Sequence, residues 1–217
     1  MVNWQNIDNV LLDMDGTLLD LSFDNYFWLE FLPQKISDVK TIPLEEAAET
    51  VRSLSKSTYG SLLWYCLDHW SEKLEMDVEA LKKEVRHRIK MRPHCQELLS
   101  YLKNLNKRVI LVTNAHPKAL AIKVTASGLH EHLEEMISSH ELELAKENDG
   151  FWEKLGNRES IDLTRSLFID DSLPVLECAQ RSGIKHLIQV LHPDSNGQPL
   201  QPSQFQGIIH LDDLMVA

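Results

Sequence analysis

The sequence predicts an α/β fold, a doubly wound parallel sheet with an all-helical segment inserted after the first strand. Short, near-continuous apolar runs recur from about residue 7 and again from about residue 107 to the end. Such runs are typical of strands buried on both faces of a parallel sheet. Stretches with helical signals separate them, which is the βα alternation of a doubly wound sheet. From about residue 20 to 92 the apolar spacing is instead helical throughout.

The apolar runs give the strands in chain order. They lie at 10–12, 109–112, 167–169 and 187–188, with a weaker run at 136–137 and a last short strand at 208–209. Two of the intervening helices have recognisable ends. Pro117 fits the first turn of a helix that stops at Gly128, and Pro174 and Gly183 frame another helix in the same way.

The helical segment is expected to form a unit of its own. Residues 1–19 and 93–217 would form the α/β core domain, and residues 20–92 the inserted domain. In the later part of the insertion, charged residues such as Lys82 surround one apolar helical face. That face consists of Val78, Leu81, Val85 and Ile89.

Composition limits the class of protein. A chain of 217 residues with 43% hydrophobic residues can form one good core and a small second unit. Its net charge of -11 repels nucleic acids and anionic membranes, so neither is an expected partner. Cys66, Cys95 and Cys178 are scattered and form no CxxC pair, which favours reduced thiols in a cytoplasmic protein over a zinc site or a disulfide framework.

Polar side chains follow four of the predicted strands, at the edge where open α/β sheets bind their ligands. Each group alone has a simple structural explanation, because Asp-Gly is a common turn and Thr-Asn an ordinary helix cap. Four such groups in succession are hard to explain as turns alone. They are Asp13 with Asp15, Thr113 with Asn114, Lys146, and Asp170 with Asp171.

Carboxylates that converge in one crevice need compensation. At about 4 Å and an effective dielectric constant near 20, each pair repels by roughly 4 kcal/mol. Because the set contains oxygen ligands and neither His nor Cys, it favours Mg²⁺ over zinc. With an ammonium group and helix-start amides, such a site suits a phosphoryl group, which a carboxylate can attack to form an aspartyl-phosphate. A second carboxylate two residues later can then serve as acid and base.

These motifs resemble those of the haloacid dehalogenase-like hydrolases. Residues 13–18, Asp-Met-Asp-Gly-Thr-Leu, resemble the first motif of that family. Thr113-Asn114 is similar to the second motif, Lys146 to the third and residues 169–172 to the fourth, all in family order. The resemblance implies a Rossmann-like core with a helical cap inserted after the first motif, and Mg²⁺ as cofactor.

The resemblance also implies residue roles. Asp13 would be the nucleophile and a Mg²⁺ ligand, and Asp15 the general acid and base, with its carbonyl on the metal. Asp171 would be the remaining metal ligand, with Asp170 behind it or sharing the ion. Because an acid at Asp15 can protonate an alkoxide, which a halide does not require, phosphate ester hydrolysis is favoured over dehalogenation.

The phosphoryl group would be bound at the second and third motifs and beside the nucleophile. Glu147 departs from the family pattern, since many relatives have Pro after the third-motif lysine. Lys154 is therefore an alternative to Lys146. The implied phosphate-binding residues are Met14, Thr113, Asn114 and Lys146.

Three stretches, at residues 23–28, 112–117 and 167–172, resemble the bacterial GMP/IMP nucleotidases of this superfamily. That subgroup removes the 5′-phosphate of purine monophosphates, so a purine nucleotide is the expected small-molecule partner. A small sugar-phosphate phosphatase or a phosphomutase of the same superfamily is an alternative, as is a non-catalytic phosphate-binding relative.

Aromatic residues of the insertion are candidates for stacking against a base. Tyr26, Phe27 and Trp28 follow the nucleophile loop and are the better candidates for the substrate side. Trp64 and Trp70 fit the apolar face of the inserted helices, which favours a place in their core.

Overall fold

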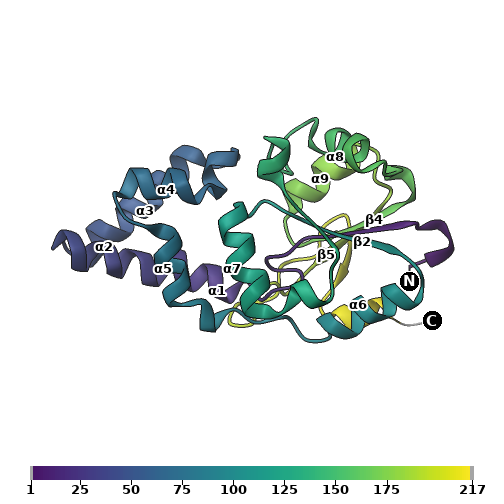
Figure 1. Ribbon diagram of the computed structural model, residues 1–217, viewed down its shortest axis with the longest axis horizontal. Coiled ribbons are helices and arrows are strands. Elements are labelled where there is room, and N and C mark those ends of the chain that lie inside the picture. Colours follow the sequence, from purple (N-terminus) through teal and green to yellow (C-terminus); the bar gives the residue numbers. More distant parts are fainter. Residues whose placement is uncertain (1, 216–217) are drawn as a thin grey trace.

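The computed structural model describes residues 2–215 and contains a six-stranded parallel sheet (Figure 1). The strand order is β3-β2-β1-β4-β5-β6, so the sheet grows from β1 in both directions. The reversal beside β1 is the point at which doubly wound sheets open a ligand crevice. The strands are β1 (Asn9–Leu12), β2 (Arg108–Thr113), β3 (Glu135–Ser138), β4 (Ser166–Asp170), β5 (His186–Val190) and β6 (Gln206–Ile208).

Helices cover both faces of the sheet. Because alternate residues of a strand point to opposite faces, Leu12 packs in one core cluster and Leu11 in the other. The first cluster includes α6 and α7, and the second includes α8 and α9, which lie across the sheet from α6 in Figure 1. The doubly wound α/β prediction is confirmed. The helices are α6 (Cys95–Asn104), α7 (Pro117–Ser127), α8 (Phe151–Glu159) and α9 (Leu173–Arg181).

The inserted segment, residues 20–92, is helical and extends from the sheet on the side of α7 (Figure 1). Its buried residues, among them Phe27 and Trp70, belong to the same core cluster as those of α6 and α7. The segment therefore packs continuously onto one face of the α/β part. Its helices are α1 (Ser22–Tyr26), a π-helical turn (Phe27–Phe31), α2 (Leu32–Lys40), α3 (Leu44–Thr58), α4 (Leu67–Leu74) and α5 (Val78–Glu84).

Short 3-10 helices complete the chain. They are η1 (Trp4–Asn6), η3 (Leu62–Tyr65), η4 (Arg86–Arg88), η5 (Leu129–Glu131), η6 (Ser139–Leu142), η7 (Leu163–Arg165) and η8 (Leu211–Leu214). Among residues 2–215, no helix combines the length and the apolar character that a membrane crossing requires. The ends of the predicted core domain, residue 1 and residues 216–217, lie outside the described residues.

The predicted helix ends have a clear basis in the backbone. Pro117 occupies the first turn of α7, and Gly128 ends the helix with a φ of 78° in the left-handed region. Gly183, with a φ of 98°, follows α9 in the same conformation.

The last strand was predicted at 208–209, which begins two residues later and ends one residue later than β6. β6 ends at Ile208, whose carbonyl accepts a hydrogen bond from the Leu191 N–H at 2.8 Å. Ile209 is 40% exposed, and its carbonyl accepts instead from the Arg92 guanidinium at 2.9 Å. The residue leaves the strand because its backbone bonds to this side chain rather than to β5.

Candidate active site

The predicted polar residues come together at the carboxyl edge of the sheet. Leu12 at the end of β1 pairs with Leu111 of β2 and Ile169 of β4, so the residues after these strands are neighbours. Asp13 and Asp170 project from adjacent strand ends and are both buried. The crevice that they enter lies at the reversal of strand order beside β1.

Lys146 joins two of these carboxylates. Its Nζ lies 2.5 Å from Oδ1 of Asp13 and 2.7 Å from Oδ2 of Asp170, and it donates a third bond to the Val112 carbonyl at 3.1 Å. The side chain is buried, so little water screens these ion pairs. Lys154 points elsewhere, because its Nζ donates to the Leu142 carbonyl at 2.8 Å. Of the two alternative lysines, Lys146 is the one beside Asp13.

The three carboxylates of Asp13, Asp170 and Asp171 could hold a metal ion. One oxygen from each lies within 4.8 Å of the others. Burial raises the pKa of all three, against the lowering effect of Lys146, and that of Asp13 reaches about 7. When all three carboxyl groups are ionised, they exceed the one ammonium group by two negative charges. A divalent cation with oxygen ligands fits both this charge and these donors.

The loop after β1 brings Asp171 close to the site. Gly16 has a φ of 88°, and a Cβ there would lie 2.7 Å from Cγ of Asp171. Only glycine therefore allows both this loop conformation and the approach of the carboxylate. The Arg92 guanidinium donates to the Gly16 carbonyl at 2.8 Å and fixes the loop from the end of the inserted segment.

Asp15 lies on the other side of the crevice, paired with a lysine that the sequence analysis missed. Its Oδ2 is 2.7 Å from Nζ of Lys123 in α7, which also lies 2.6 Å from Asp24. Asp24 in turn pairs with Lys82 at 2.9 Å. Burial raises the pKa of Asp15 to about 6, opposed by Lys123 and supported by Asp24 and Asp13. A carboxyl group with this pKa can exchange protons near neutral pH.

Lys82, one of the charged residues around the apolar helical face of the insertion, does not lie on the surface. It is buried, with its ammonium 4.3 Å from the ring centroid of Phe27 and paired with Asp24. The sequence does contain a sign of this burial, because Lys82 lies four residues after Val78 and so falls within a helix face that is otherwise apolar. Lys123 has the same signature, since it lies on the buried face of α7 four residues after Ala119.

The second-motif residues organise the backbone around Lys146. The Asn114 side chain accepts a bond from the Lys146 N–H at 2.9 Å and donates to Glu147 at 2.8 Å. Thr113 is buried at the end of β2, and its hydroxyl accepts from the Ala115 N–H at 3.0 Å. Glu147 also accepts from the Tyr65 hydroxyl at 2.9 Å. The carboxylate that replaces the family's proline thus links the site to the inserted segment.

Met14 contacts the Asp13 carboxylate with its backbone, whereas its side chain is buried in the core. The side chain is fully buried in the core, while the backbone group next to Asp13 hydrogen-bonds to that carboxylate and lowers its pKa. The Met14 carbonyl accepts bonds from the Leu18 and Leu19 N–H groups at 3.0 and 2.8 Å. These bonds close the loop that follows β1.

A cavity of about 850 Å³ connects these residues with the inserted segment. Of the three aromatics expected on the substrate side, only Trp28 lines it. Phe27 is fully buried, and Tyr26 stacks with the Arg88 guanidinium 3.7 Å from its ring centroid. The aromatic residues along the cavity are Trp28, Tyr59, Trp64, Tyr65 and Trp70.

Trp64 and Trp70 both pack with the core of the insertion and line the cavity. Trp70 is buried, as expected of a core residue, and its indole N–H donates to the Trp64 carbonyl at 2.8 Å. Both residues also line the cavity. The volume is in the range that binds small organic ligands.

Comparison with known proteins identifies the family. The haloacid dehalogenase-like hydrolase profile matches residues 10–188. The GMP/IMP nucleotidase YrfG of Escherichia coli (strain K12) is 39% identical over 212 residues, which are 98% of this chain and 94% of that protein. The protein of the same name from Shigella flexneri matches to the same extent.

Solved structures share the fold. A HAD phosphatase from Thermococcus onnurineus superposes with a TM-score of 0.79 and 20% identity, over 96% of each chain. The L-2-haloacid dehalogenase from Xanthobacter autotrophicus, with chloropropionic acid covalently bound, gives a TM-score of 0.63 and 15% identity, again over 96% of each chain. With the family profile and the 39% identical relative, the conclusion is that this chain belongs to the haloacid dehalogenase-like hydrolase family and is a phosphatase.

Proposed function

We propose that this phosphatase is a Mg²⁺-dependent 5′-nucleotidase that hydrolyses purine nucleoside monophosphates such as GMP and IMP through an aspartyl-phosphate. The observation that carries the proposal is the buried Asp13 carboxylate, held by Lys146 in a crevice with two further carboxylates. The 39% identity to the GMP/IMP nucleotidase YrfG supports the substrate class. The cysteines, all free, fit action in the cytoplasm.

The chemistry divides between Asp13 and Asp15. An Asp13 oxygen attacks phosphorus, so that an O–P bond forms and the ester O–P bond breaks. Asp15 gives its proton to the departing ribose oxygen. In the second half, Asp15 takes a proton from water as the water oxygen attacks phosphorus, which releases phosphate and regenerates the Asp13 carboxylate.

The other site residues bind and orient the phosphoryl group. Lys146 would neutralise part of its charge, and Thr113, Asn114 and the Met14 backbone would hold its oxygens. Asp13, Asp170, Asp171 and the Asp15 carbonyl would hold Mg²⁺. When bound, the ion supplies positive charge that offsets the phosphoryl oxygens and the carboxylates.

We infer that residues 20–92 act as a cap that binds the nucleoside. The aromatic rings along the cavity provide flat apolar surface, and stacking of a base on such a ring contributes about 1–3 kcal/mol. Lys82 and Lys123, which also line the cavity, pair with Asp24 and Asp15 and so offset negative charge along its wall. These ion pairs would reduce the repulsion that an anionic substrate meets in a protein with a net charge of -11.

Substrate preference is the most direct test of the proposed function. With Mg²⁺ present, phosphate release should show a higher kcat/KM for GMP and IMP than for CMP, UMP and simple sugar phosphates. The larger purine ring offers more surface for stacking in the cavity. A sugar phosphate as the best substrate would contradict the proposal in favour of a sugar-phosphate phosphatase, and an isomerised product without free phosphate would indicate a phosphomutase.

The two aspartates of the nucleophile loop should have separable effects. Asp13→Asn should abolish phosphate release, because the neutral amide is a poor nucleophile. Asp15→Asn should lower kcat by about 10²–10⁴-fold, because the leaving group loses its acid, while substrate binding survives. Steady-state kinetics with equilibrium binding of GMP measures both. Wild-type activity of purified Asp13→Asn protein would refute the mechanism, and the surface variant Asp8→Asn serves as the matched control.

Lys146 and Lys154 provide a matched pair for the third motif. Lys146→Met should lower kcat/KM by about 10²-fold or more, because the charge beside Asp13 is lost. Lys154→Met should leave kcat/KM near the wild-type value, since the Lys154 ammonium donates to the Leu142 carbonyl and not to Asp13. Circular dichroism with Mg²⁺ present checks that both variants are folded. The reverse ranking of the two variants would show that Lys154 is the functional lysine.

The stability of the protein should depend on pH, and the stabilisation by Mg²⁺ should depend on pH as well. Because burial raises the pKa of Asp13 from 3.8 to about 7, the folded metal-free protein holds more protons than the unfolded chain between these values. The free energy of unfolding of the metal-free protein should therefore fall as pH rises from about 4 to 7. Saturating Mg²⁺ should raise the melting temperature more at pH 8 than at pH 5. Equal shifts at both pH values would argue against a carboxylate-bound ion, and EDTA should abolish phosphate release.

A further inference from the structure

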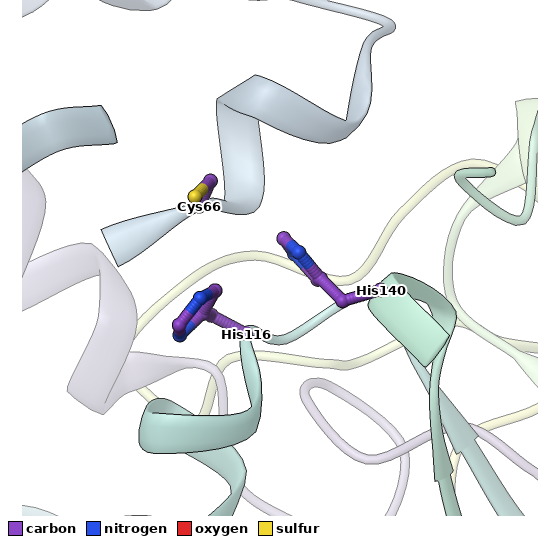
Figure 2. Close-up of side chains that lie close together, drawn as sticks. All are labelled: Cys66, His116 and His140. Carbon is purple, nitrogen blue, oxygen red and sulfur yellow. The ribbon is translucent and has the colours of Figure 1, made fainter. Parts of the chain in front are cut away.

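A second cluster of metal-binding side chains lies outside the carboxylate site (Figure 2). It consists of Cys66, His116 and His140, and one ligand atom from each lies within 4.8 Å of the others. Cys66 ends the η3 turn of the inserted segment, while His116 precedes α7 and His140 lies in η6. Figure 2 shows the three side chains gathered in the space between these elements.

We propose that Cys66, His116 and His140 form a zinc site that bridges the inserted segment and the α/β part of the protein. The donors are a thiolate sulfur and two imidazole nitrogens, which are ligand types that Zn²⁺ prefers, and three protein ligands would leave a fourth position for water. The site is distinct in chemistry from the carboxylate cluster, whose oxygen ligands suit Mg²⁺. The inference goes beyond the proposed function and does not depend on it.

The spacing of the ligand atoms is close to that of a zinc site. Ligands at about 2.0–2.3 Å from a tetrahedral ion lie about 3.3–3.8 Å from one another. The ligand atoms of the three residues lie within 4.8 Å of one another, so side-chain rotations that move these atoms by about 1 Å would bring them to the distances of a zinc site. All three residues are half-buried, which leaves room for this adjustment and a route for the ion.

An unused nitrogen supports the proposal independently. Nε2 of His140 is buried and has no hydrogen-bond partner among residues 2–215, which is a costly state for a polar atom. A metal ion would satisfy it. His116 sits edge-on to His140, with ring centroids 4.8 Å apart, so its nitrogens are within reach of the same ion.

The charges around the cluster are compatible with a bound cation. Zn²⁺ would bind the neutral imidazole form of His116 and His140. Asp68 lies 3.8 Å from Nε2 of His116, and Lys118 pairs with the same carboxylate at 2.6 Å. Binding would release the Cys66 thiol proton to solvent and leave one net positive charge on the ion and its thiolate.

His116 already has a structural contact that the site would have to accommodate. Its Nδ1 accepts a long hydrogen bond of 3.4 Å from the Lys118 N–H at the start of α7. A bond of this length is weak, so exchanging it for a metal contact costs little. The nearby Asp68 carboxylate could then accept the proton of the second ring nitrogen, as is common for metal-bound histidines.

Cobalt substitution tests the site without any measurement of turnover. The metal-free protein is titrated with Co²⁺ in the presence of excess Mg²⁺, which competes for the carboxylate cluster. We expect a thiolate-to-cobalt charge-transfer band in the near ultraviolet and visible bands of tetrahedral cobalt, at one ion per chain. Oxygen ligands alone produce no thiolate band, so the carboxylate cluster cannot mimic this result.

Matched cysteine variants assign the band. Cys66→Ser should lose it and should raise the apparent Kd for Zn²⁺, measured by competition with an indicator, by about 10-fold or more. Cys178→Ser should retain both, and so should Asp13→Asn, in which the carboxylate cluster is broken. His140→Gln should weaken zinc binding while leaving the thiol intact. Melting curves without metal check that each variant is folded.

Two results would overturn the proposal. One is a wild-type cobalt spectrum without a thiolate band. The other is a band that persists in Cys66→Ser and disappears in Cys178→Ser. The cobalt spectra do not depend on which substrates the protein hydrolyses. The zinc site and the proposed nucleotidase function can therefore be refuted independently of each other.

Discussion

The ion pairs of Lys146 with Asp13 and Asp170 are the interaction on which the site depends. They place an ammonium group between two buried carboxylates from adjacent strand ends, at 2.5 and 2.7 Å. Without it, the carboxyl edge of the sheet would concentrate negative charge that burial makes expensive. With it, Asp171 still leaves an excess of negative charge. This excess is what the proposed divalent cation would offset, and the bound ion would then attract a phosphoryl group.

A second chain of ion pairs extends this electrostatic balance into the inserted segment. Asp15, Lys123, Asp24 and Lys82 alternate in charge, with neighbouring groups 2.6–2.9 Å apart. The Asp15 carboxyl is at one end and α5 at the other. Burial raises the pKa of Asp15, and Lys123 lowers it, so that the value of about 6 reflects a compromise. The packing of the insertion thus contributes to the acidity of the residue proposed to protonate the leaving group.

The parts predictable from sequence are those that depend on local pattern. Apolar runs followed by polar residues predicted the strands and the meeting of Asp13, Thr113 and Asp170, because parallel strands end at one edge. The contacts that the pattern missed join residues far apart in the chain. Lys123 and Asp24 are 99 positions apart and Lys82 and Asp24 are 58, and no spacing rule pairs them. Which of Lys146 and Lys154 contacts Asp13 likewise could not be predicted, because it depends on the path of the loop that follows β3.

The departure from the family pattern at Glu147 has a structural consequence of the same long-range kind. Proline offers no side-chain acceptor, whereas Glu147 accepts from both Asn114 of the α/β part and Tyr65 of the insertion. Cys66, the next residue after Tyr65, faces His116 and His140. One short stretch of the insertion therefore contacts the α/β part through a carboxylate on one residue and through potential metal ligands on the next. Because both contacts converge on the loops around Asn114 and Lys146, the position of the insertion is coupled to the geometry of the residues proposed to bind the phosphoryl group.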